Sequence, residues 1–133
     1  MHGDIIADIK SAFIPDFQTD FPEVGLVIDN SPFDFDKPGN AWVEVNIDFH
    51  RGSQVNLSNS PKTRYAGVVR VCVNVKEGTG TELVNTVQDW FIARFKYLSA
   101  SGFQFDAPMP DGSDRLKGWY YSDMKFNFKT NPL

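Results

Sequence analysis

The sequence predicts an α+β fold, in which a mixed, mainly antiparallel sheet carries an N-terminal helix and one long central helix packed on one face. Two observations predict this class. Apolar and polar residues alternate along residues 41–49 and 64–76, as in strands with one buried face. Along residues 80–99, apolar residues instead recur every three or four positions, which is the period of an amphipathic helix.

Length and composition limit the classes of protein to consider. The 133 residues fit a single domain, 1–133, and 41% of them are hydrophobic, which is enough for a buried core. The net charge of −4 differs from that of a basic nucleic-acid binder, so we expect no direct nucleic-acid readout. The single cysteine, Cys72, excludes an intrachain disulfide and suits a reducing compartment. No signal peptide or membrane span is recognisable, so we expect no membrane partner.

The N-terminal helix is expected over residues 4–14, with Pro15 ending or kinking it because proline has no backbone N–H to donate. Its apolar residues recur at helical spacing: Ile5, Ile6, Ile9, Phe13 and Ile14. Residues 15–40 are rich in proline and glycine, and they predict a loop that contains a short strand at 26–28.

Each of the two alternating strands predicts one core-facing row of side chains. In the first strand this row is Ala41, Val43, Val45, Ile47 and Phe49. In the second strand it is Val69, Val71, Val73 and Val75. Residues 50–63 between them are polar and have no apolar period, so they predict a long loop.

The central helix is expected from Gly80 to Ser99. Thr79 and Glu82 stand three apart and match a capping box, with Thr79 as N-cap. The helix carries an apolar stripe of Leu83, Val87, Phe91, Phe95 and Leu98. Residues 103–105 predict a short strand, residues 106–118 a loop, and residues 119–130 a final alternating strand.

The glycine-rich corner at residues 76–82 could be a phosphate-binding loop or a structural turn. A P-loop needs Lys and then Ser or Thr after its last glycine, whereas Thr81 and Glu82 follow Gly80 here. A dinucleotide fingerprint needs a third glycine, and Asn85 stands near that position. We therefore interpret Gly78, Thr79, Gly80 and Glu82 as a structural turn.

No other segment predicts a chemical site. Asp34, Asp36 and Gly39 have the spacing of a calcium loop, but Pro38 and Val45 occupy positions that need ligands, so we expect a turn and no metal. Cys72 lies among valines, which predicts an inert buried thiol. His2 and His50 are the two histidines, and no nucleophile motif accompanies them. We expect no catalytic residue, no cofactor and no enzymatic activity.

The polar segment 50–64 is the candidate interface. Arg51, Lys62 and Arg64 bracket it, and acidic residues in other loops could pair with these cations in a second copy. The interface candidates are Arg51, Gln54, Asn56, Asn59, Lys62 and Arg64. The acidic loop residues are Asp34, Asp36, Asp111 and Asp114.

Two segments, 64–98 and 118–129, resemble tail terminator proteins of long-tailed phages, the minor tail protein U type. The first segment begins "RYAGVVRVCVNVKEGTGTELVNTVQDWFIARF" (residues 64–95). It has Arg64 and Gly67 ahead of the alternating valines, then the turn glycines Gly78 and Gly80 and the long helix. The second, "GWYYSDMKFNFKT", opens on the aromatic pair 119–120.

The resemblance implies a non-enzymatic virion protein with a small mixed sheet and helices on one side. Such proteins form homo-oligomeric rings, typically hexamers, on the end of the tail tube. Their partners are other copies, the tail tube protein and the head-completion or connector proteins. They stop tube polymerisation and provide the surface for head–tail joining, and they lie at the head-proximal end of the tail after assembly in the host cytoplasm. The alternatives are another phage neck or tail adaptor, or a small phosphate- or nucleotide-binding enzyme that uses the glycine corner.

Overall fold

The structure is a computed structural model, and it describes residues 2–29, 39–54, 63–98, 103–116 and 118–130. The elements follow the chain as α1 (His2–Asp20), β1 (Gly25–Ile28), β2 (Ala41–Gln54), β3 (Thr63–Lys76), α2 (Glu82–Leu98), β4 (Phe103–Phe105), β5 (Met109–Leu116) and β6 (Trp119–Thr130). The strands form one six-stranded sheet in the order β1-β2-β3-β6-β4, and β5 also pairs with β6. The β1–β2 pair is parallel and the other pairs are antiparallel, so the predicted mixed, mainly antiparallel α+β fold is confirmed.

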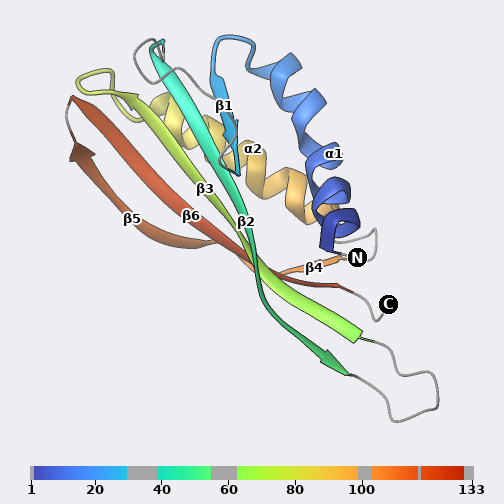
Figure 1. Ribbon diagram of the computed structural model, residues 1–133. Coiled ribbons are helices and arrows are strands. Elements are labelled where there is room, and N and C mark those ends of the chain that lie inside the picture. The colour runs from blue at the N-terminus through green and yellow to red at the C-terminus, as the bar shows by residue number, and fades with distance from the viewer. Residues whose placement is uncertain (1, 30–38, 55–62, 99–102, 117, 131–133) are drawn as a thin grey trace.

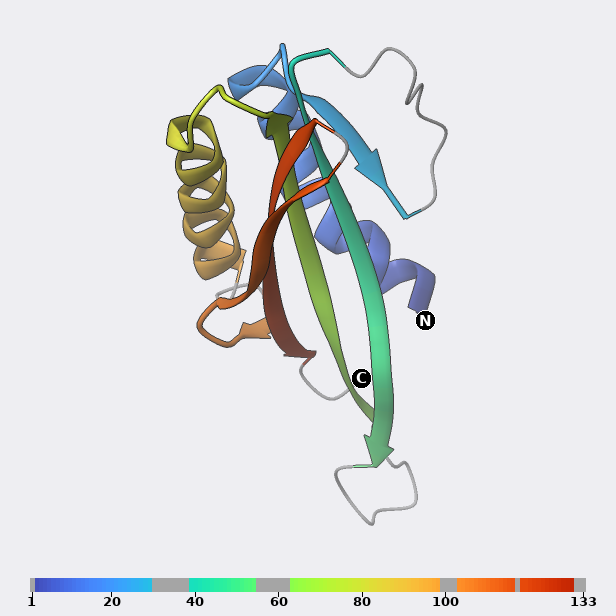
Figure 2. The same cartoon turned by 90° about the vertical axis from the view of Figure 1, so that its left-hand side faces the viewer.

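Both helices cover the same face of the sheet, and the opposite face carries no helix from the described part of the chain (Figures 1 and 2). The core lies between the helices and the sheet, where alternate residues of β2 and β3 point. The predicted strand rows are confirmed, because Val43, Val45, Val69, Val71 and Val73 are all fully buried. No helix among the described residues is long and apolar enough to cross a membrane.

The long helix α2 turns Val84, Val87, Phe91 and Phe95 into the core, close to the predicted stripe. Rings from both helices and from the sheet meet there. The Phe95 ring centroid lies 6.1 Å from that of Phe13 on α1 and 4.8 Å from that of Phe126 on β6. Burial of these large side chains is the main favourable contribution to the packing of α2.

The helix α1 extends through Pro15 to Asp20, so the expected range of 4–14 was too short. Of the two roles expected for Pro15, ending or kinking the helix, the first was wrong. Pro15 lies on the exposed side of α1, whereas Ile9, Phe13 and Phe17 lie fully buried on the opposite side. A proline inside a helix costs about 3 kcal/mol. The burial of Phe17 one turn beyond Phe13 offsets that cost, because tertiary packing supplies most of a helix's stability.

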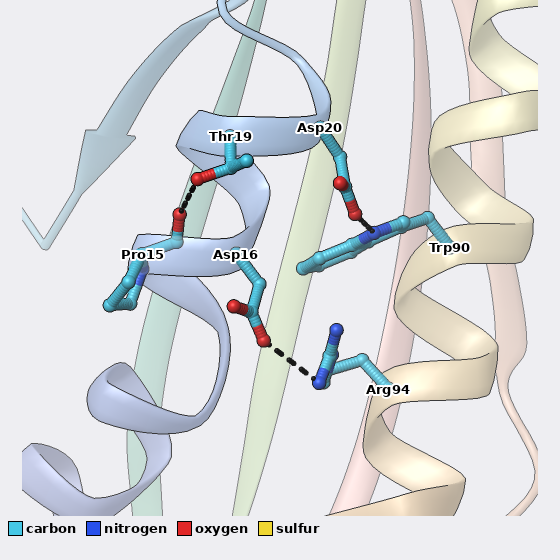
Figure 3. Close-up of polar contacts among 6 residues, drawn as sticks. All are labelled: Pro15, Asp16, Thr19, Asp20, Trp90 and Arg94. Atoms are coloured by element: carbon cyan, nitrogen blue, oxygen red, sulfur yellow. Dashed lines mark hydrogen bonds and ion pairs between the residues drawn. The ribbon is translucent and has the colours of Figure 1, made fainter.

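Polar contacts hold the last turns of α1 against α2 (Figure 3). The Arg94 guanidinium pairs with Asp16 at 3.0 Å and lies 5.1 Å from the centre of the Trp90 ring. The Trp90 indole N–H donates to Asp20 at 2.8 Å. These contacts join α1 beyond Pro15 to α2, so they favour continuation of the helix.

Gly67 on β3 lets two aromatic rings meet across the strand. Its neighbours in the sheet are Phe49 on β2 and Phe128 on β6, and their ring centroids lie 6.1 Å apart. A Cβ atom on Gly67 would clash with the carbonyl oxygen of Asp48 and would lie 2.8 Å from Cζ of Phe128. A glycine in a strand often marks such a close approach, and this approach gives a physical reason for the glycine in the Arg-x-x-Gly segment.

We expect Gly67→Ala to lower the free energy of unfolding by about 1–3 kcal/mol, because the added methyl group has to displace a backbone carbonyl and a packed ring. Urea unfolding followed by circular dichroism measures this loss. A prior Phe128→Leu substitution removes the ring and should reduce the further cost of Gly67→Ala. A Gly67→Ala protein within about 0.5 kcal/mol of the wild type would show that this contact does not constrain β3.

The segment predicted as a loop at 106–118 contains the strand β5, so that prediction was wrong for most of its length. The register between β5 and β6 shifts between Pro110 and Gly112, which marks a bulge. Gly112 has φ 114°, a backbone conformation that favours glycine. Proline and glycine are tolerated in edge strands and bulges, so their presence concealed this strand in the sequence.

Candidate assembly surfaces

The glycine corner between β3 and α2 is a tight turn. Gly78 and Gly80 have φ angles of 91° and 83°, which fits the prediction that the backbone needs glycine there. Both the backbone N–H and the hydroxyl of Thr79 donate to the carbonyl of Lys76, at 3.2 and 2.7 Å. Thr79 therefore closes the turn at the end of β3.

The predicted capping box was wrong. The helix α2 begins at Glu82, and the N–H of Asn85 donates to the carbonyl of Thr81 at 3.0 Å. That bond makes Thr81 the N-cap and Glu82 the first helical residue, so Glu82 is not three residues past the cap. Its carboxylate lies in the first turn, where the helix dipole favours negative charge. Two glycines with positive φ extend the turn and delay the helix beyond the start expected from the sequence.

Two cations border this corner and could suggest a phosphate site. A shallow depression of about 310 Å³ is lined by Lys76, Gly80 and Arg115, among others. The Arg115 guanidinium, however, lies 3.4 Å from the carboxylate of Glu77, which lines the same depression. The negative charge of the Glu77 carboxylate opposes the approach of a phosphate, and Glu82 adds a second carboxylate in the first turn of α2. The arrangement therefore supports a structural turn better than a phosphate site.

The thiol of Cys72 lies between two carboxylates on the helix-free face of the sheet. Glu44 on β2 and Asp123 on β6 are its direct cross-strand neighbours. Burial, then the hydrogen bond to Asp123 and its charge, raise the pKa of the Cys72 thiol far above its usual range. The thiolate is the nucleophilic form, so this environment disfavours a reactive cysteine. No metal-binding group of three or more His, Cys, Asp or Glu occurs among the described residues.

We expect Cys72 in the folded protein to react with iodoacetamide at pH 8 at least about ten-fold more slowly than in the urea-unfolded protein. The raised pKa lowers the thiolate fraction of the folded protein at this pH, and the thiolate is the form that attacks iodoacetamide. Mass spectrometry of timed samples gives both rates, and Cys72→Ser is the unlabelled control. Equal rates in the two states would contradict the inert assignment.

The β2–β3 hairpin extends past the rest of the sheet, so the loop predicted at 50–63 is much shorter. Beyond a register shift between Phe49 and Arg51, four more residue pairs continue the ladder, from Arg51↔Ala66 to Gln54↔Thr63. We name residues 51–54 and 63–66 the arm. It projects away from the body and from the helices (Figures 1 and 2).

Three of the interface candidates lie in the arm. Arg51 and Gln54 are in its first strand, and Arg64 is in its second, paired with Ser53. The others, Asn56, Asn59 and Lys62, lie outside the described residues, as do Asp34 and Asp36. Asp114 is exposed on β5, and Asp111 lies on the same strand. The structure thus places the described candidates on one narrow ribbon instead of a broad loop.

A groove along α2 was not predicted from the sequence. Two depressions of about 500 and 460 Å³ share Ile92 and Pro108, so they join into one groove between α2 and the segment leading into β5. Its helix side is formed by Asn85, Gln88, Asp89, Ile92 and Phe95, which recur at helical spacing. Met109, between the lining residues Pro108 and Pro110, is 53% exposed. Such a groove arises only from tertiary packing, so no local pattern in the sequence indicates it.

Comparison with known proteins identifies the fold alone. No protein-family model matches the chain, and no curated protein matches it. One solved structure superposes with a TM-score of 0.68 over 98% of this chain and 96% of its own length, at 11% sequence identity. The name of that protein states no activity, ligand or partner. The likeness shows that this fold also occurs in another protein of similar length.

Proposed function

We propose that this chain is a tail terminator of a long-tailed phage, a non-enzymatic virion protein that forms a ring on the tail tube. The ring stops polymerisation of the tube and offers its other side to head-completion or connector proteins at the head-proximal end of the tail. The hexamer is the ring size that the resemblance implies. The proposal needs no cofactor, metal or membrane.

The observation that carries the proposal is the arm. It extends the β2–β3 hairpin beyond the sheet, with no third strand from the described residues beside its last pairs. An isolated two-stranded ribbon is marginally stable in water, and its unpaired edges favour contact with another chain. The segments that carry the resemblance also correspond to one structural unit, because 64–98 and 118–129 are β3, the glycine corner, α2 and β6.

The proposal is tested with a tail tube protein taken from the genome that encodes this chain. The tail tube protein is polymerised with and without the present chain. Tube lengths are measured, and tube ends are examined, by negative-stain electron microscopy. We expect short tubes with a ring at one end. Tubes of the same length in both samples would overturn the proposal. Binding to head connectors without an effect on tube length would instead identify a neck adaptor.

The enzyme alternative depends on the glycine corner, where Lys76 and Arg115 lie near the start of α2. Thermal unfolding with ATP, GTP and NAD distinguishes a nucleotide site from a structural turn. A ligand that binds the folded state raises the unfolding temperature as its concentration increases. We expect no shift with these ligands. A concentration-dependent rise that Arg115→Ala removes would favour the enzyme.

A further inference from the structure

Apart from Ala66 at its base, which pairs with Lys129 of β6, the arm has no third strand on either edge within the described residues. On the β2 side, the β1 pairing ends at Ile28↔Val45, and on the β3 side the β6 pairing ends at Ala66↔Lys129. The bulge between Phe49 and Arg51 lies where the arm begins, and bulges bend a strand and increase its twist. The arm is therefore a two-stranded projection bent away from the sheet. The unpaired backbone N–H and C=O groups along its edges can bond to a partner.

The groove along α2 has the right length to accept this projection. Its helix side runs from Asn85 to Phe95, and ten helical steps of 1.5 Å span about 15 Å. Four residues of a strand span about 13 Å. The floor of the groove is apolar, with Ile92 and Phe95 from α2 and Phe126 from β6. The arm of the same copy points away from α2, so it does not occupy this groove (Figures 1 and 2).

The charges of the two surfaces are opposite. The arm contains Arg51 and Arg64 and no Asp or Glu. The groove is bordered by the carboxylates of Asp89 and Asp106, with no Lys or Arg among its described lining residues. The Asp123 side chain points to the opposite face, beside Cys72. Asp89 and Asp106 are exposed, so both carboxylates are accessible to an approaching cation. Opposite charges at an interface set its register and exclude wrong partners.

We propose that the arm of one copy of this chain lies in the α2 groove of the next copy. Each copy has one arm and one groove, which are different surfaces, so the contact is heterologous and can continue around a closed ring. The inference rests on the proposed ring and names the contact that builds it. The partner surface is a second copy, because the complementary arm and groove occur on the same chain.

Charge reversal tests this contact in the full-length protein. The arm variant carries Arg51→Glu with Arg64→Glu, and the groove variant carries Asp89→Arg with Asp106→Arg. Each variant alone opposes like charges across the contact and should need at least about ten-fold more protein to assemble. Mixed one to one, each arm meets a groove of opposite charge, so assembly should return to near the wild-type concentration. Sedimentation velocity and native mass spectrometry measure assembly.

The controls separate this contact from general effects of charge. Arg70→Glu reverses one arginine charge on β3 outside the arm, at an exposed site on the helix-free face, and should assemble like the wild type. Thermal unfolding of each variant shows whether the monomer remains folded. A wild-type chain that stays monomeric, variants that assemble normally, or a mixture that does not recover would each overturn the inference.

Two further outcomes distinguish the contact from the proposed function. If mixing restores rings but tubes still grow uncapped, the tail-terminator function fails and the arm–groove contact stands. If rings persist in the arm variant while its binding to the tail tube protein is lost, the arm contacts the tube and the inference is overturned.

Discussion

Phe91→Ala is expected to lower the free energy of unfolding by about 3–5 kcal/mol, because it empties the space of a large ring at the centre of the core. Phe91 is fully buried. Its ring centroid lies 5.7 Å from that of Phe13 and 5.5 Å from that of Phe17, both on α1. The substitution therefore loosens the attachment of α1 as well as that of α2. Urea unfolding followed by circular dichroism measures the effect.

Phe21→Ala is the matched control, since it removes the same atoms from a half-buried position. The Phe21 ring also contacts the aromatic cluster, at 5.0 Å from Phe17 and 6.1 Å from Trp90. Its removal leaves space that water can enter, so we expect a smaller loss than for Phe91→Ala. A loss below about 1 kcal/mol for Phe91→Ala would mean that this face of α2 contributes little to the monomer core, and an oligomer contact would become the better explanation.

The core elements were predictable because each one has a strong local period. Val43 and Val45 alternate with polar residues on β2, and Phe91 and Phe95 are one turn apart on α2. Both patterns result from one-sided burial, so they identify the buried face without knowledge of the partner. The two longest paired strands and the long helix were placed correctly for this reason.

The elements that the sequence concealed lack a buried face or contain residues that disfavour their structure. The arm strand at 51–54 is polar, because a two-stranded ribbon exposed to water has no apolar period to show. Pro110 and Gly112 are uncommon inside strands, so the sequence of β5 resembles that of a loop. Pro15 favours a helix end, so the sequence did not indicate the part of α1 that follows it. Burial of Phe17 against α2 stabilises that part of the helix. Tertiary contacts override local preference in the helix, and strand pairing does so in β5.

The candidate site was predictable only in part. The sequence indicated that the 50–64 segment carries cations suited to an interface, and the structure places Arg51 and Arg64 on the arm. Residues from three segments form the groove along α2, and no local pattern brings Asp89 and Asp106 to the same groove. Which surfaces lie beside one another depends on the packing of α2 against the sheet, so this part of the site required the structure.

Removal of the arm is expected to abolish ring formation and leave a folded monomer. The pair Arg51↔Ala66 lies at the base of the arm, so residues 52–65 can be replaced by Asn-Gly, which favours a two-residue hairpin turn between paired strands. The described core residues of β2 and β3 lie between Ala41 and Ile47 and between Val68 and Val75, so they all remain. The free energy of unfolding should therefore change by less than about 1 kcal/mol.

The loss of assembly should be complete, because a heterologous ring cannot close when every copy lacks one of the two surfaces. Native mass spectrometry at several protein concentrations should find only monomer, and tail tubes assembled with this variant should exceed the wild-type length. The control exchanges Ser53→Thr and Thr63→Ser, which keeps the ribbon and its charges and should cap tubes normally. If the shortened protein still forms rings and caps tubes at wild-type length, the arm is not the assembly surface. If it no longer unfolds cooperatively, the arm belongs to the folded core.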